Sequence, residues 1–91
     1  MVRARIRLET SSQVTDFVRE LNSDGTINKY TIENSDGTYR VNARSYLGVL
    51  YASAEFKGIL YLVNETNDDP FPVFIDKYRP LSEDDGDYIH T

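Results

Sequence analysis

Few side chains in this 91-residue sequence have the types and spacing that covalent or metal chemistry requires. The chain has no cysteine, which excludes a thiol nucleophile and a thiolate zinc site. Its one histidine, His90, is the penultimate residue and has no neighbouring group to orient a ring nitrogen. Two acidic clusters, Asp68-Asp69 and 83–87, lack the spacing and glycine placement of a calcium loop. We therefore expect no enzyme activity, no catalytic residue, no cofactor and no metal site.

Hydroxyl groups at two expected helix starts are the remaining polar groups of interest. Thr10 and Gln13 have the spacing of a capping box, in which each residue hydrogen-bonds the backbone N–H group of the other. Ser45 follows a short strand pattern and precedes apolar residues at helical spacing. Its hydroxyl is therefore placed to accept a hydrogen bond from a backbone N–H group in the first helical turn. The sequence predicts that both Thr10 and Ser45 are helix N-caps.

The elements that would position these residues are short and alternate between strand and helix patterns. Strand patterns cover residues 2–8, 26–32, 38–43 and 59–63, and the middle two flank the hairpin signal Asp36-Gly37. Helix patterns cover about eleven residues ending near Asn22, about two turns after Ser45, and residues 71–78 after Pro70. The order β-α-β-β-α-β-α predicts an α+β fold, with helices on one face of a four-stranded antiparallel sheet.

Composition limits the chain to one small domain. With 40% hydrophobic and 27% charged residues it fits a single core, which we place in residues 1–80, followed by an acidic, disordered tail over 81–91. No run approaches the roughly 18 apolar residues of a membrane span. The first residues lack the apolar region of an export signal, so we expect a cytoplasmic protein. The net charge of −5 disfavours general binding to nucleic acid.

The run RSYLGV at residues 44–49 resembles the serine-site region of HPr, the histidine-containing phosphocarrier family of the bacterial phosphoenolpyruvate:sugar phosphotransferase system. The order of elements is similar too, as are the first helix, TDFVREL, and the last, FIDKYRPL, so the resemblance spans about residues 2–80. It implies an open-faced β-sandwich with sheet order 1-4-2-3 and three helices on one face. It also matches Ser45 to the family's regulatory serine and Arg44 to the basic residue before it. Ser45 is then either a plain N-cap or one regulated by phosphorylation, which adds roughly −1.5 to −2 charges.

The loop that carries the phosphorylated histidine in that family is different in this chain. Residues 8–14 contain no histidine, arginine or proline, so we expect no phosphohistidine transfer. The family's partner surface, an apolar patch on the helix after the serine, corresponds here to Tyr46, Leu47 and Leu50, with Arg44 beside it. Leu50 faces either the core or this surface. The resemblance implies a non-catalytic regulatory or adaptor module that binds protein partners, among them phosphotransferase or catabolite-control components.

The sheet face away from the helices is a second interaction candidate. Alternation places three arginines there, Arg3, Arg5 and Arg7. The resemblance implies that Leu60 and Leu62 point to the same outer face. Their neighbours Ile59, Tyr61 and Val63 would then point to the helices. An apolar strip beside a cationic one suits a protein partner or self-association. Two alternatives therefore remain: a structural or self-associating bacterial or phage accessory protein that shares only the fold, and nucleic-acid binding through the three arginines.

Overall fold

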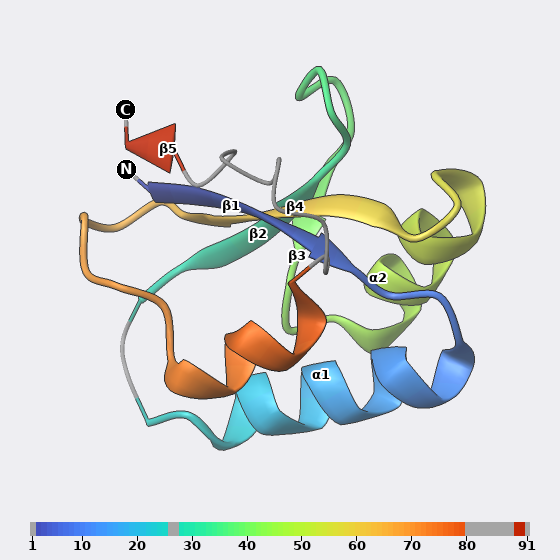
Figure 1. The fold of residues 1–91 in the computed structure, drawn as a ribbon, viewed down its shortest axis with the longest axis horizontal. Coiled ribbons are helices and arrows are strands. Elements are labelled where there is room, and N and C mark those ends of the chain that lie inside the picture. The colour runs from blue at the N-terminus through green and yellow to red at the C-terminus, as the bar shows by residue number, and fades with distance from the viewer. Residues whose placement is uncertain (1, 26–27, 80–88, 91) are drawn as a thin grey trace.

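Strand β1 (Val2–Arg7), in which apolar residues alternate with arginines, lies in a sheet of four main strands and one short additional strand. The computed structural model describes residues 2–25, 28–79 and 89–90. In it β1 neighbours β4 (Ile59–Asn64), followed by β2 (Tyr30–Glu33) and then β3 (Arg40–Asn42). All three pairings are antiparallel. The predicted α+β class and the sheet order 1-4-2-3 are therefore confirmed (Figure 1).

A fifth strand, β5 (Ile89–His90), extends the sheet on the other side of β1. It pairs antiparallel with Val2 and Arg3. These two residues were expected to belong to a disordered tail, and no strand was predicted there. Two residues carry too little alternation to signal a strand, and what defines this one is its pairing with the edge of β1. The other residues of the expected tail, 81–88 and 91, lie outside the described residues.

The helices α1 (Ser11–Ser23) and α2 (Tyr46–Glu55) and the 3₁₀ helix η1 (Val73–Tyr78) lie on one side of the sheet (Figure 1). The sequence pattern predicted an α-helix over residues 71–78, after Pro70, where η1 lies. The helix begins instead after Pro72, because Phe71, as the residue before a proline, is disfavoured in helical conformation. Only the six residues Val73–Tyr78 are then helical, and such a short helix commonly takes 3₁₀ geometry. In the described part of the chain no helix is long and apolar enough to cross a membrane.

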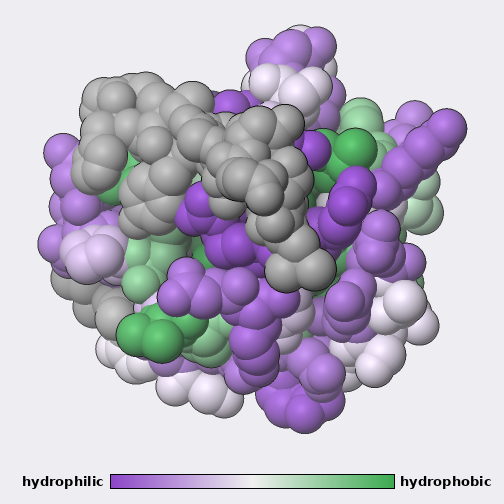
Figure 2. Space-filling view, in the orientation of Figure 1, coloured by the Kyte–Doolittle hydropathy of each residue, from purple (hydrophilic) through white to green (hydrophobic). Residues whose placement is uncertain are grey.

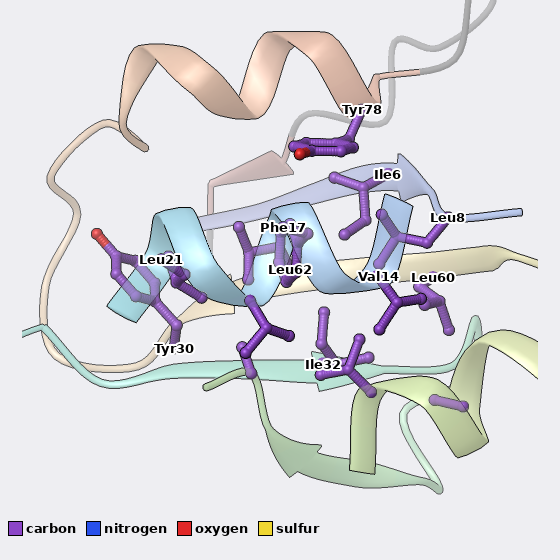
Figure 3. Close-up of a cluster of buried hydrophobic side chains, with 14 of the residues drawn as sticks. Ile6, Leu8, Val14, Phe17, Leu21, Tyr30, Ile32, Leu60, Leu62 and Tyr78 are labelled. Atoms are coloured by element: carbon purple, nitrogen blue, oxygen red, sulfur yellow. The ribbon is translucent and has the colours of Figure 1, made fainter. Parts of the chain in front are cut away.

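The core fills the space between the sheet and the helices. The buried side of α1 presents Val14, Phe17, Val18 and Leu21 to the sheet, at the spacing that the sequence predicts. The ring of Tyr78 in η1 packs edge-on against Phe17, with ring centroids 5.5 Å apart (Figure 3). On the face of the molecule shown in Figure 2, hydrophilic surface predominates and hydrophobic surface forms smaller patches. Apolar packing of the helices on the sheet therefore holds the fold together.

The prediction that Leu60 and Leu62 lie on the outer face is wrong. Both side chains are fully buried, and Figure 3 shows them on the side of the sheet that α1 covers. Leu60 pairs with Ile6 in the antiparallel register, and directly opposed residues point to the same face. Tyr61, between the leucines, lies on the outer face instead. A run of five apolar residues has no alternation of its own, so the pairing register alone decides which face is buried.

This register predicts a large difference between two leucine substitutions. Leu62→Ala should lower the free energy of unfolding by about 2–5 kcal/mol, because it leaves a cavity in the core. Leu47→Ala, at a side chain that is 73% exposed, should change it by less than about 0.5 kcal/mol. Urea denaturation followed by circular dichroism measures both values. Equal effects of the two substitutions would contradict the inward orientation of Leu62.

Candidate functional site

Helix α2 is apolar on its solvent side as well as on its core side. Its core side carries Val49, Ala52 and Ser53, which are buried. The solvent side, which we call the α2 face, consists of Tyr46, Leu47, Leu50, Tyr51 and Ala54. Leu47 is 73% exposed, Tyr51 56% and Tyr46 38%, whereas Leu50 is half-buried. No charged residue precedes Glu55 in this helix, so no charge interrupts the α2 face.

Two contacts on the core side determine which way α2 is turned. Gly48 lies against β3 so closely that a Cβ atom there would be 2.3 Å from a methyl carbon of Val41. The buried hydroxyl of Ser53 donates a hydrogen bond to the carbonyl oxygen of Leu8, 2.5 Å away. Because a small residue and a satisfied hydroxyl occupy the inner side, the larger apolar side chains of the helix remain outside.

The start of α2 is held by the N-cap that the sequence predicts. The Ser45 hydroxyl accepts a hydrogen bond from the backbone N–H of Gly48 at 3.4 Å. Ser45 is also exposed, so its oxygen is accessible from solvent at the edge of the α2 face. Arg44, predicted as a partner-binding residue, is directed to the protein itself: its guanidinium donates hydrogen bonds to the carbonyl oxygens of Leu21 and Asn28. It thus ties the start of α2 to the end of α1 and to the segment that enters β2.

Aromatic packing fixes the other edge of the α2 face. The ring centroid of Tyr51 is 5.8 Å from that of Tyr39, which in turn lies 5.3 Å from that of Phe56. The Tyr39 hydroxyl donates a hydrogen bond to the carbonyl oxygen of Gly48 at 3.4 Å. Burial, with a further contribution from Tyr51, raises the pKa of the Tyr39 phenol above its ordinary value. Tyr51 is therefore held against the β2–β3 hairpin with half of its surface still in solvent.

The N-terminus of α1, where the resembled family carries its histidine, is closed by the predicted capping box. The Thr10 hydroxyl accepts from the N–H of Gln13 at 3.1 Å, and the Gln13 side-chain oxygen accepts from the N–H of Thr10 at 3.2 Å and of Glu9 at 2.7 Å. His90 lies in β5 opposite Val2, at the other end of β1 from Thr10. The structure therefore does not bring the single histidine to this helix terminus.

The outer sheet face carries a network of charges that the chain itself pairs. The guanidinium of Arg3 lies 3.8 Å from the ring centroid of Tyr61 and 3.4 Å from the carboxylate of Glu33. The other oxygen of Glu33 is 3.0 Å from Arg40, which also pairs with Glu65. Because these carboxylates neutralise Arg3 and Arg40 locally, this part of the outer face offers an anionic partner less attraction than the arginine pattern suggests.

No protein-family model, curated protein or solved structure matches this chain. The geometry of the site is therefore the main guide to function. Of the residues predicted on the partner surface, Tyr46 and Leu47 are exposed and adjacent on α2, and Leu50 lies between core and solvent. Sequence reasoning did not assign Tyr51 or Ala54 to a site. The signal that could have revealed them is the absence of charged residues in α2 before Glu55. A helix that buries only one side normally carries charged or polar residues on the other.

The N-cap at Ser45 predicts a specific loss of stability. Ser45→Ala should lower the free energy of unfolding by about 1 kcal/mol, because a backbone donor loses its partner. Ser45→Asp should leave it almost unchanged, since a carboxylate accepts the same bond and suits the positive end of the helix dipole. Ser12→Ala, at an exposed position inside α1, is the matched control. If thermal or urea denaturation shows the same loss for Ser45→Ala and Ser12→Ala, the cap does not contribute to stability.

Proposed function

We propose that this protein is a non-catalytic module that binds another protein through the α2 face. One observation carries the proposal: five neighbouring side chains, three of them large and exposed, form an apolar surface that no charge interrupts. Removing apolar surface from water is worth roughly 25 cal/mol per Å², so covering these side chains is favourable. Aromatic residues such as Tyr46 and Tyr51 are typical anchors of protein interfaces.

The finer form of the proposal is an HPr-like regulatory or adaptor module acting in the cytoplasm. It is supported by the sheet order 1-4-2-3 and by the run RSYLGV, which supplies the cap and the first turn of α2. The partners would be phosphotransferase or catabolite-control components. Phosphohistidine transfer is not part of this function, because residues 8–14 include no histidine.

Nucleic-acid binding through Arg3, Arg5 and Arg7 is the weaker alternative. Phosphate binding depends on a surplus of cations on the binding face, whereas Arg3 already contacts Glu33 and the chain as a whole has a net charge of −5. A structural accessory protein that associates with itself is the stronger alternative, since the α2 face suits a second copy as well as a different protein.

Replacing Leu47 should abolish capture of a partner. We expect the wild-type chain, immobilised and exposed to lysate of its native cell, to retain a protein that Leu47→Glu does not retain, because a buried unpaired carboxylate opposes docking. Tyr46→Ala should weaken capture while leaving the fold intact. Val73→Glu makes the same kind of change at an 85% exposed residue of η1 and should retain the partner. Loss of the partner with both glutamate variants, or with neither, would refute docking on the α2 face.

The regulatory part of the proposal concerns Ser45. Incubation with the serine kinase that modifies HPr proteins should add one phosphate, which mass spectrometry should place on Ser45. The added charge of roughly −1.5 to −2 would lie beside Tyr46 and Leu47 and should weaken apolar docking there. The Ser45→Ala variant should stay unmodified and bind normally. An unmodified Ser45 in the wild-type chain would exclude this form of regulation.

A further inference from the structure

Strand β1 has two sides, and the described strands pair with them to different extents. One side pairs with β4 along the whole of β1, whereas the other pairs with β5 at Val2 and Arg3 alone. Within the described residues, no strand lies beside residues 4–7 on this second side. The edge of a strand presents backbone N–H and C=O groups to any extended segment that lies next to it. The edge of β1 therefore suits a longer strand than the two residues of β5.

This edge carries a concentration of positive charge on one face. The six residues of β1 contain three of the ten basic residues of the chain, at alternate positions, and the ring of Tyr61 under Arg3 places them on the outer face. Arg7 lies 3.5 Å from the carboxylate of Glu9, but both side chains are exposed, and such a surface pair contributes little. A strand that suits this edge has carboxylates at alternate positions, because directly opposed residues point to the same face.

The chain contains one segment with this pattern, and β5 follows it directly. β5 is antiparallel to β1, with His90 opposite Val2 and Ile89 opposite Arg3. The same register, counted along the sequence into the residues outside the described part, sets Asp87 opposite Arg5 and Asp85 opposite Arg7. Covalent geometry keeps Asp87 within about 7 Å of Ile89, which is also the distance along a strand between Arg3 and Arg5.

The match depends on this one register. A shift of one residue in either direction would set Gly86, instead of a carboxylate, opposite Arg5 or Arg7. On the inner face, the observed register sets Tyr88 opposite the small Ala4 and Gly86 opposite the larger Ile6. Ile6 belongs to the core cluster that also contains Tyr78 of η1 (Figure 3). A residue without a side chain is therefore suitable opposite Ile6.

We propose that residues 85–88 continue the pairing of β5 along β1, so that Asp85 and Asp87 bind Arg7 and Arg5 and shield them from other anions. The occupant of this edge is thus the C-terminal segment of the chain itself. Four of the five residues in 83–87 are acidic, which makes the segment an intramolecular competitor of polyanions. This contact lies on a different surface from the α2 face and does not depend on docking there.

Introduced cysteines test the register, because the chain has none of its own. The full-length Arg5→Cys/Asp87→Cys variant should form an intramolecular disulfide under mild oxidation, since opposed Cβ atoms lie about 4.5–5.5 Å apart. Arg7 and Asp85 remain in this variant to hold the segment. The matched control is Arg5→Cys/Asp84→Cys, in which the second cysteine is roughly 10 Å further along the strand. It should form the disulfide at least ~tenfold more slowly.

Two results of this cross-linking would overturn the proposal. Equal rates for the two cysteine pairs would show that the segment has no preferred position on β1. A disulfide that forms only between two chains, visible as a band of twice the monomer mass on a non-reducing gel, would place the segment on a second copy.

Retention on a heparin column tests the shielding, with heparin as the polyanionic probe. Asp85→Asn/Asp87→Asn should elute at a higher salt concentration than the wild-type chain, because the arginines of β1 become accessible to sulfate groups. Asp68→Asn/Asp69→Asn removes two carboxylates from exposed positions before η1 and changes the net charge equally, so it is the matched control. The control should elute close to the wild-type chain, and circular dichroism should show the same fold for all three.

The arginines themselves complete the test. Adding Arg5→Gln and Arg7→Gln to the Asp85→Asn/Asp87→Asn variant should abolish its gain in retention, because the uncovered cations are then absent. Equal gains for the variant and its control would assign the effect to net charge alone, and no gain at all would show that the segment does not shield β1. Either result would overturn the proposal.

Discussion

The antiparallel pairing of β1 with β4 is the contact on which the rest of the structure depends. It joins two strands that are far apart in the sequence, and its register places Ile6 beside Leu60. All three helices pack on the apolar face that this register creates. A shift of one residue would move the leucines of β4 into solvent and bring Tyr61 under α1. The position of every helix, and with it the place of the α2 face, therefore follows from one strand pairing.

Helix α2 shows how a short segment with apolar residues on all sides is oriented. Hydrophobicity alone does not choose between burying Leu47 and burying Val49. Close approach at Gly48 and the hydrogen bond of Ser53 to Leu8 both require the same inner side. Packing shape and polar satisfaction thus decide what hydrophobicity leaves open, and the consequence is an apolar surface in water.

The sequence was informative wherever its signals are local. Alternation in β1, the 3.6-residue period of α1 and the capping box at Thr10 each involve residues within one element, and the structure confirms them. The resemblance also supplied the sheet order and drew attention to Tyr46 and Leu47. The face of β4, the inner side of α2 and the strand β5 depend on partners distant in sequence, so local patterns could not show them. Of the candidate α2 face, the sequence therefore pointed to Tyr46, Leu47 and Leu50 and did not single out Tyr51 or Ala54.

Arg44 connects three elements at the base of α2. Its guanidinium donates hydrogen bonds to carbonyl oxygens at Leu21 and Asn28, while the Asn22 side chain donates to its carbonyl oxygen and its cap neighbour Ser45 begins the helix. The exposed side chains of α2 consequently project from a base anchored to both α1 and the sheet. The surface that we propose for docking is thus already preorganised, so association there would cost the backbone of α2 little conformational entropy.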